Sequence, residues 1–414
     1  MSHLISVMVH TPAHSGLGGA LTYSSDTFLP AGTLVRVPLG ARELLGVVWD
    51  TPLPQSATDL TLRPVSHALE GVEPLSPSWR QLVQFAAHYY QRSVGEVALA
   101  ALPNQLRELS AAQWARRLQR KAKADTPSER DAPQIPQATP EQSEVLAQIA
   151  TQPGPFLLFG NTGSGKTEVY LRAAHEVLTR HAKAQVLVMV PEINLTPQLE
   201  ARFRARFAPV WGESCLVTLH SGLTPAQRLN HWLAAHKGQA RIVLGTRMAV
   251  FASMPGLQLI VVDEEHDPSY KQQEGARYSA RDLAVYRGQL EKAKVILGSA
   301  TPSLESWHHS RSATDTEPAG RYLRLHMPSR VGQGALPLVR RVDMNRQPYK
   351  TVFSSHLLDA MRERITRGEQ ILVLLNRRGY APVLHCTDCG WKSECPHCSA
   401  YRVFHKLDRT LRCH

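Results

Sequence analysis

The stretch "FLLFGNTGSGKTEVY", residues 156–170, decides the fold of this chain. An apolar run typical of a buried β-strand leads into a glycine-rich loop, and the loop leads into residues that suit the first turn of a helix. Backbone N–H groups of such a loop can turn inward around phosphate oxygens, and the N-terminus of the following helix adds partial positive charge. The stretch therefore predicts a strand–loop–helix unit that holds the phosphates of a nucleotide.

The glycine-rich loop matches the pattern G-x-x-x-x-G-K-[ST] at every position. In this pattern Lys166 is expected to reach the β- and γ-phosphates, and the Thr167 hydroxyl is expected to sit on Mg²⁺. The predicted phosphate-binding residues are Gly160, Asn161, Thr162, Gly163, Ser164, Gly165, Lys166 and Thr167.

A second apolar run, "LIVVDEEHD" at 259–267, ends in acidic residues. Asp263 can hold Mg²⁺ through its water shell, and Glu264 is placed to orient and deprotonate the attacking water. We expect both carboxylates beside the phosphate loop, because the carboxyl ends of parallel strands share one edge of a sheet. Two more strand ends, "GTR" at 245–247 and "GSATPS" at 298–303, carry hydroxyls that can sense the nucleotide or contact a nucleic-acid backbone.

Apolar runs alternate with helical segments from residue 138 to about 310. Most of these runs are continuous, as expected when both faces of a sheet are covered. The pattern predicts an α/β fold with a parallel sheet wrapped by helices. The predicted strands are 156–160, 185–191, 215–221, 240–246, 257–266 and 294–301, and the helical segments include 166–180, 224–236 and 279–292.

The rest of the chain predicts smaller parts. The first part is a small β-rich domain with strands in "GTLVRVPLG" and "ELLGVVWD" and a helix after Ser76. The start of a second sheet domain is predicted from a helix near 355–367 and the strand "ILVLLN". The predicted parts are 1–105, a basic linker at 106–137, the sheet domain at 138–310, the start of the second sheet domain at 311–384, and a cysteine-rich region at 385–414.

Composition indicates the class of partner. The 414 residues carry 47 Lys and Arg against 35 Asp and Glu, a net charge of +12, which favours a polyanion such as nucleic acid. No apolar run approaches the roughly 18 residues that a membrane span needs, and the start lacks a cationic leader. We therefore expect no membrane association. Cys215, alone at the start of a predicted strand, is expected in the core.

The remaining five cysteines lie between 386 and 413. Cys386 and Cys389 form one CxxC pair, and Cys395 and Cys398 form a second. A CxxC pair presents two thiolates to one tetrahedral zinc, and two pairs normally complete one site. The spacing thus indicates Zn²⁺ in a reducing compartment rather than disulfides.

The order of phosphate loop, Asp-Glu-Glu-His, Gly-Thr-Arg and Ser-Ala-Thr resembles superfamily 2 helicases. Longer stretches resemble the PriA family of replication-restart helicases, also called primosomal protein N′. They are "VMVPEINLTPQ", "LHSGLT", "VVDEEHDPSYKQQEGARYSARDLAVYR", "LGSATPSLES" and "LLNRRGYAPVLHCTDCGWKSECPHC". In the N-terminal part, "LVRVPLG" and "YYQRSVGEVALAALP" are similar to the family's 3′-end-binding domain. The resemblance covers nearly the whole chain except about 106–137.

This resemblance implies a RecA-like helicase lobe and an ATP-dependent 3′-to-5′ DNA helicase. Such an enzyme recognises stalled or abandoned replication forks and initiates primosome assembly. The implied partners are forked and single-stranded DNA, primosome proteins, single-strand DNA-binding protein and the replicative helicase with its loader, in a cytoplasmic, nucleoid-associated location. The main alternative is a catalytically weak scaffold that binds forks and recruits primosome proteins without unwinding. A different superfamily 2 translocase is a third possibility.

Further roles follow from the resemblance. His266 couples hydrolysis to DNA. Gln142, in "TPEQ", matches the position that reads adenine, with an exposed linker glutamine as the alternative. Thr246 and Arg247 touch the DNA strand. The aromatic-rich loop at 269–287 supplies cations for the backbone and rings for bases, through Tyr270, Lys271, Arg277, Tyr278, Arg281 and Arg287.

In the cysteine-rich region, family members bind two zincs with eight cysteines in interleaved pairs. Here only Cys413 of the third pair is present. His397 or His414 replacing a missing ligand, or a single zinc shared by the first two pairs, are alternatives that stay open.

Four departures from the family pattern bear on function. The chain stops inside the second lobe, before the arginine finger, which contributes roughly 10³–10⁵ in rate, so we expect a fragment or truncated product that binds ATP better than it turns it over. The segment 106–137 is too short for a winged-helix domain. The family's aromatic–Asp–Tyr near the 3′-end pocket appears as Leu21-Thr22-Tyr23, and Ala276 replaces a tryptophan.

Overall fold

The computed structural model divides the chain into two compact units, residues 1–334 and 335–414. Among the described residues, no helix is long and apolar enough to cross a bilayer. The structure describes residues 3–11, 19–52, 62–109, 111–118, 135–191, 196–314, 318–332, 338–348, 351–374, 383–384, 386, 389–396, 401–405 and 409–413.

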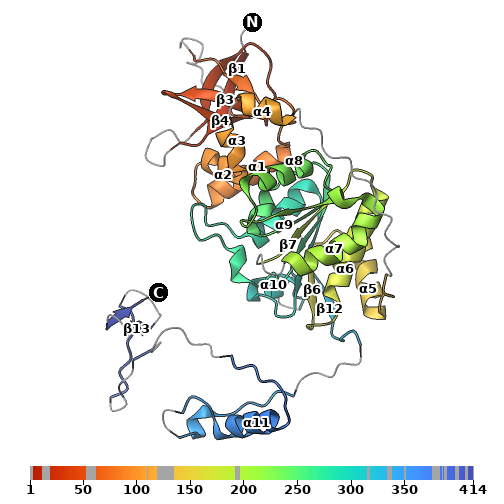
Figure 1. Ribbon diagram of the computed structural model, residues 1–414, viewed down its shortest axis with the longest axis vertical. Coiled ribbons are helices and arrows are strands. Elements are labelled where there is room, and N and C mark those ends of the chain that lie inside the picture. Colours follow the sequence, from red (N-terminus) through yellow and green to blue (C-terminus); the bar gives the residue numbers. More distant parts are fainter. Residues whose placement is uncertain are drawn as a thin grey trace. The chain divides into compact units, whose positions relative to one another are not determined.

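The first unit begins with an antiparallel sheet in the order β2-β1-β4-β3-β5 (Figure 1). Its strands are β1 (His3–Val9), β2 (Leu21–Ser25), β3 (Leu34–Leu39), β4 (Arg42–Trp49) and β5 (His67–Ala68). The helices that follow are α1 (Pro77–Tyr89), α2 (Val94–Ala101), α3 (Asn104–Glu108) and α4 (Ala111–Leu118). Strands β3 and β4 and helix α1 were predicted. The Ser76 side chain caps α1 by accepting from the N–H of Trp79.

Helix α4 extends the N-terminal domain beyond the predicted boundary at 105. The indole Nε1 of Trp114 donates to the Glu70 carbonyl at 3.0 Å, and Trp114 is 6% exposed. The basic helix therefore docks on the domain through one large apolar side chain, a contact that its charged composition does not reveal. The predicted linker residues 119–134 lie outside the described part of the chain.

The second part of this unit is a parallel sheet in the order β12-β6-β11-β10-β7-β9-β8. All six predicted strands are confirmed. The strands are β6 (Phe156–Gly160), β7 (Gln185–Met189), β8 (Leu216–Leu219), β9 (Ile242–Gly245), β10 (Leu257–Val262), β11 (Lys294–Ser299) and β12 (Leu323–Met327).

Strand β12 was not predicted, and it moves the end of this domain past the expected boundary at 310. It pairs in parallel with β6. In this strand Leu325 and Met327 are buried, Arg324 is half-buried, and Leu323 and His326 are exposed. An edge strand with this half-polar pattern resembles a connecting region, which explains the missed prediction.

Helices cover both faces of the parallel sheet. Helices α5, α6 and α7 share a core with one face, and α8 and α9 share a core with the other (Figure 1). They are α5 (Pro140–Thr151), α6 (Lys166–Arg180), α7 (Thr196–Trp211), α8 (Pro225–His236), α9 (Ala280–Glu291) and α10 (Leu304–His309), with 3₁₀ turns η3 (Glu213–Cys215), η4 (Arg247–Phe251) and η5 (Pro268–Tyr270). Cys215 is 2% exposed, as predicted for a core residue.

The N-terminal domain and the parallel-sheet domain share one continuous apolar core. Trp79 of α1 is 1% exposed, and its Nε1 donates to the Phe251 carbonyl of η4 at 2.8 Å. The ring of His236 lies between the Ser253 hydroxyl and the Glu73 carbonyl, at 2.9 Å from each. Buried hydrogen bonds inside an apolar joint fix the relative position of the two domains.

The second unit contains η6 (Met344–Arg346), α11 (Ser355–Thr366) and an antiparallel pair, β13 (Val403–His405) and β14 (Thr410–Arg412). Helix α11 was predicted. The strand predicted at 371–376 is not formed over 371–374, and Leu372 and Leu374 are 96% and 90% exposed. A strand needs a pairing partner, and none lies beside this segment in the described part of the unit; its last two residues lie outside that part.

Candidate nucleotide-binding site

The carboxyl ends of β6 and β10 border one open cavity of about 750 Å³. From β6 come loop residues including Gly165, Lys166 and Thr167, and from β10 come Asp263 and Glu264. The phosphate loop and the acidic strand end therefore lie together, as their positions in a parallel sheet predicted.

The backbone of the loop has the shape that its glycines allow. Gly163 and Gly165 both have φ of +85°, in the left-handed region that favours glycine. A Cβ at Gly165 would displace the Gln142 side-chain amide and would also be strained by the positive φ. Lys166 Nζ donates to the Gly160 carbonyl at 2.8 Å, and Ser164 Oγ is buried without a partner among the described groups. A cation and an unused hydroxyl beside a turned-in loop fit the phosphates of ATP.

Gln142 belongs to this site and is not an exposed linker residue. It is 3% exposed and lies in the first turn of α5, where its Oε1 accepts from the Thr139 N–H at 3.0 Å. Its Nε2 donates to the Gly165 carbonyl at 3.3 Å. The side chain thus caps a helix and contacts the loop at once.

The segment after β12 crosses the loop. The N–H of Val331 donates to the Gly163 carbonyl at 2.9 Å, and the N–H of Ser329 donates to Glu141 at 3.3 Å. Val331 also lines the cavity. Sequence analysis did not predict this contact, because the residues it joins are far apart in the chain.

Asp263 sits in an environment that opposes its charge. Burial, and then the neighbouring charge of Glu264, raise the pKa of Asp263 above its ordinary value. The Tyr170 hydroxyl donates to Asp263 Oδ1 at 2.9 Å, and the Tyr270 hydroxyl donates to the Asp263 carbonyl at 2.7 Å. Tyr170 was missed by sequence analysis, although it lies one helical turn after Lys166 and therefore on the same face of α6.

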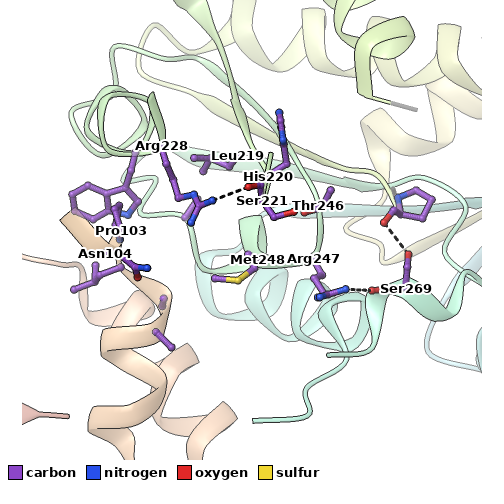
Figure 2. A pocket seen from close by; sticks show the side chains of 16 residues that line it. Pro103, Asn104, Leu219, His220, Ser221, Arg228, Thr246, Arg247, Met248 and Ser269 are labelled. Carbon is purple, nitrogen blue, oxygen red and sulfur yellow. Dashed lines mark hydrogen bonds between the residues drawn. The ribbon is translucent and has the colours of Figure 1, made fainter. Parts of the chain in front are cut away.

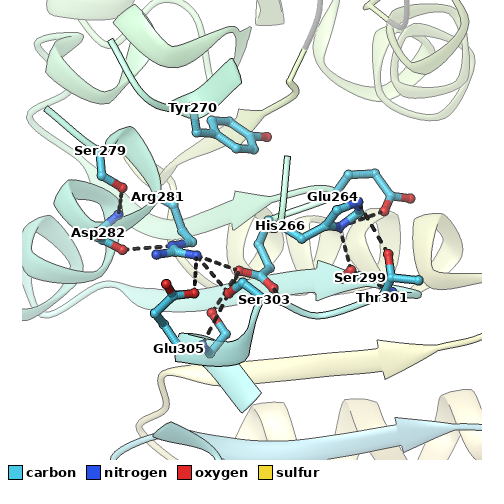
Figure 3. Close-up of polar contacts among 12 residues, drawn as sticks. Glu264, His266, Tyr270, Ser279, Arg281, Asp282, Ser299, Thr301, Ser303 and Glu305 are labelled. Carbon is cyan, nitrogen blue, oxygen red and sulfur yellow. Dashed lines mark hydrogen bonds and ion pairs between the residues drawn. The ribbon is translucent and has the colours of Figure 1, made fainter. Parts of the chain in front are cut away.

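Glu264 has φ of +45°, a left-handed conformation that costs a non-glycine residue about 1–3 kcal/mol. Glu264 lines the cavity, whereas the side chain of the next residue, Glu265, is fully buried. Glu264 Oε2 is 3.6 Å from His266 Nδ1, and the same ring nitrogen is 2.8 Å from the Ser299 hydroxyl. His266 Nε2 is 3.4 Å from Thr301 Oγ1 (Figure 3). His266 thus connects the cavity to the "GSATPS" loop.

Glu265 forms a buried cluster that sequence analysis did not predict. Its side chain is fully buried and accepts from the Ser303 N–H at 2.7 Å and the Ser306 hydroxyl at 2.8 Å. The Ser303 hydroxyl donates at 3.0 Å, and Arg281 Nη1 donates at 3.3 Å. Arg281 was predicted to contact DNA; it pairs with Glu265 and Asp282, and its contact with DNA stays a prediction.

Family profiles agree with this arrangement. The family described as "DEAD/DEAH box helicase" matches residues 139–309, and the family described as "3'DNA-binding domain (3'BD)", from PriA, matches residues 6–103. "Replication restart protein PriA" of Haemophilus influenzae is 33% identical in an alignment 457 residues long, gaps included. The alignment covers 94% of this chain and 61% of that protein. This chain belongs to the PriA family.

Other PriA proteins align over shorter stretches. The Bacillus subtilis protein is 40% identical over 63% of this chain and 31% of its own length, and the Rickettsia felis protein is 31% identical over 93% and 56%. This chain therefore spans between about a third and three fifths of the length of these relatives.

Solved structures overlap this PriA chain only in part. The Hef helicase domain of Pyrococcus furiosus is 23% identical over 40% of this chain and 33% of that chain, with a TM-score of 0.31. DEAD-box helicase Mss116, bound to ssRNA and UDP-BeF, is 17% identical over 47% and 41%, with a TM-score of 0.37. The assignment of a RecA-like lobe rests on the parallel sheet and the helicase profile instead.

In the aromatic-rich loop of this PriA protein, three of the residues predicted to contact DNA are buried. Tyr270 and Tyr278 are 2% and 6% exposed, so neither ring offers a face to a base. Tyr278 packs edge-on against Phe251 at 5.1 Å, in the joint with the N-terminal domain. Both rings belong to the apolar core that the two domains share, and local sequence does not show this burial. Arg287, also predicted on the DNA path, is 1% exposed and bonds the Val250 carbonyl.

The other residues predicted to contact DNA are more accessible. Lys271 and Arg277 are exposed, and Lys271 Nζ lies 5.1 Å from the Tyr90 ring centre. Thr246 and Arg247 are half-buried and line a second cavity (Figure 2). Their role in DNA binding stays a prediction.

In the N-terminal domain, Tyr23 is 4% exposed and its hydroxyl donates to the Pro38 carbonyl at 3.1 Å. It belongs to the core of the antiparallel sheet. Only Leu21 and Thr22 of the unusual triplet are therefore even partly accessible.

The cysteine-rich region is described in part. Cys386 begins a turn in which the Gly390 N–H donates to the Cys386 carbonyl at 3.0 Å, with Gly390 at φ of +73°. Cys398, His397 and His414 lie outside the described residues. Within the described part, which includes Cys389, Cys395 and Cys413, no three His, Cys, Asp or Glu side chains cluster as metal ligands. Zinc binding stays a prediction.

Proposed function

We propose that this chain couples ATP hydrolysis to 3′-to-5′ movement along DNA at stalled or abandoned replication forks. The observation that carries the proposal is the single cavity that brings Lys166 together with Asp263 and Glu264. The family assignment and the net charge of +12 support DNA as the partner. We propose further that the whole protein assists primosome assembly.

The residues of the cavity suit phosphoryl transfer to water. Lys166 would exchange the Gly160 carbonyl for phosphate oxygens, which compensate its charge better. Thr167 and Asp263 would hold Mg²⁺, which neutralises phosphate charge when bound. Glu264 would orient the attacking water and take its proton. The cation and Lys166 would oppose the burial that raises the pKa of Asp263.

Two side-chain connections suit communication between this cavity and DNA. His266 joins Glu264 to Ser299. The Tyr270 hydroxyl joins the Asp263 carbonyl to the aromatic-rich loop. Any DNA-induced shift of that loop would therefore move the metal-binding strand end, as coupling between two sites requires.

The proposal is tested by phosphate release with and without forked DNA, with Lys166→Ala as the control. We expect forked DNA to stimulate release by the unsubstituted chain only. If both proteins release phosphate at the same rate, the motor assignment is wrong for this chain and the scaffold alternative stands. Fork binding, measured separately, distinguishes a scaffold from an inactive protein.

We also propose that the cysteine-rich region binds Zn²⁺ through Cys386, Cys389, Cys395, Cys398 and Cys413. Thiolates in CxxC pairs are strong zinc ligands. Elemental analysis of the purified chain should show zinc that Cys386→Ser and Cys395→Ser reduce and Cys215→Ser does not. Equal zinc content in all of these proteins would exclude the proposed ligands.

A further inference from the structure

A short segment that follows β12, residues 328–331, crosses the outside of the phosphate loop, and we call it the strap. Near its start, Nδ2 of Asn161 donates to the Pro328 carbonyl at 2.5 Å. At its end, the Val331 N–H donates to the Gly163 carbonyl at 2.9 Å. The strap is therefore fastened to the loop at both ends.

The strap is also fastened to helix α5. The N–H of Ser329 donates to a carboxylate oxygen of Glu141, in the first turn of that helix, at 3.3 Å. The stem of Arg330 passes over Gly163, where a Cβ would lie 3.9 Å from the Arg330 Cγ. Hydrogen bonds to two elements thus fix the strap before any ligand arrives, and a preformed wall loses little entropy on binding.

The last residue of the strap presents an apolar side chain to the nucleotide cavity. Val331 lines this cavity and is 55% exposed. A Cβ built at Gly165 would lie 3.1 Å from Cγ2 of Val331 and 2.3 Å from Nε2 of Gln142. Both side chains therefore flank the residue that precedes Lys166. An accessible apolar group and a carboxamide lie together at this edge of the cavity.

The nucleotide cavity, at about 750 Å³, has room for more than phosphates. Asp263 and Glu264 mark the place of the γ-phosphate and the attacking water in the proposed reaction. The nucleoside then lies in the remainder, which the strap and helices α5, α6 and α7 line. Of the two branched apolar side chains in that remainder, Leu171 is 5% exposed and Val331 is 55% exposed. Val331 thus offers the larger accessible apolar surface to a base.

We propose that Val331 is the platform on which the base of the bound nucleotide lies. Ligand sites combine apolar surface with a few polar groups, and a base has apolar faces and polar edges. The Val331 side chain has no polar atom, so it contributes affinity for the base and none for the phosphates. The inference rests on the proposed ATP binding and adds to it a residue outside the helicase motifs.

The first test compares ADP with pyrophosphate, which lacks the nucleoside, as ligands of the full chain with Mg²⁺ in isothermal titration calorimetry. Val331→Ala should weaken ADP binding about three- to tenfold, as the loss of two covered methyl groups does, and leave pyrophosphate binding unchanged. Val331→Ile should retain the affinity for ADP. Val339→Ala is the matched control, because Val339 is 79% exposed and does not line the cavity.

The second test follows hydrogen–deuterium exchange in the peptide that contains residues 328–331. Saturating ADP should slow this exchange more than saturating pyrophosphate does, because only ADP carries a base that covers the strap. A peptide over η6, Met344–Arg346, is the control and should exchange equally with either ligand.

Two results would overturn the inference while leaving the proposed function intact. One is an affinity of Val331→Ala for ADP equal to that of Val339→Ala. The other is an equal effect on both ligands, either in the affinity of Val331→Ala or in the protection of the strap, which would mean that the strap only holds the phosphate loop. If the unsubstituted chain binds neither ligand, or Lys166→Ala binds both as well as it does, the proposed function fails first.

Discussion

Glu264 and Glu265 are neighbours in the chain, yet their carboxylates lie in opposite environments. Glu264 faces the nucleotide cavity from a left-handed backbone, 36% exposed, with His266 at 3.6 Å. Glu265 is fully buried and accepts from Ser303, Ser306 and Arg281. The first side chain is kept available for chemistry at a cost in backbone strain. The second holds the strand end in place.

The largest expected effect concerns Glu264. Glu264→Gln removes the proposed base and should lower kcat for ATP hydrolysis about 10²–10⁴-fold. The urea midpoint of unfolding should hardly change, because the side chain makes few contacts. Glu305→Gln is the control, since Glu305 is 69% exposed and contacts only Arg281 of the neighbouring Glu265 cluster. Comparable losses of kcat in the two variants would remove Glu264 from the reaction.

Glu265→Ala should act on stability. It leaves the donors of Arg281, Ser303 and Ser306 without their acceptor, and breaking a buried ion pair costs about 3–5 kcal/mol in free energy of unfolding. Urea titration at constant m measures the change. Asp282→Ala removes the exposed partner of the same guanidinium and should cost about 0–1 kcal/mol. If the two substitutions destabilise equally, the Glu265 cluster does not fix the strand end.

Asp263 lines the nucleotide cavity, as Glu264 does, and is disfavoured by burial, so its contribution to stability depends on pH. Burial raises the pKa of Asp263 above the usual Asp value of about 3.9. Between these two pKa values the folded state binds more protons than the unfolded state. The free energy of unfolding therefore falls across that window. Asp263→Asn should remove this fall and raise the melting temperature at neutral pH, while abolishing Mg²⁺-dependent turnover. The exposed Asp359→Asn is the control. An unchanged pH profile in Asp263→Asn would contradict the unfavourable burial.

Local features of this molecule were predictable from sequence, and long-range ones were not. The phosphate loop, six strands and the Ser76 cap depend on neighbouring residues, so their patterns identified them. The letters Asp-Glu-Glu-His do not show that Glu265 is buried, because its partners Arg281, Ser303 and Ser306 lie far away in the chain. Burial of Tyr270 and Tyr278 depends on a distant part of the chain, as does the place of β12 at the sheet edge.

The smallest expected effect links the N-terminal domain to the buried cluster. The Tyr90 hydroxyl accepts from the Ser279 N–H at 2.9 Å, and Ser279 caps α9, which carries Arg281. Tyr90→Phe should lower the free energy of unfolding by about 0.5–1.5 kcal/mol, the contribution of one such hydrogen bond. Tyr89→Phe removes the same atom from a neighbour that is 67% exposed and should be neutral.

A double-mutant cycle between Tyr90→Phe and Glu265→Ala then measures whether the two sites interact. Because Ser279 caps the first turn of α9, in which Arg281 lies, we expect a coupling energy of about 0.5 kcal/mol or more. Strict additivity would mean that the N-terminal domain stabilises α9 without reaching the strand end. The strand end would then be held in place by the Glu265 cluster alone.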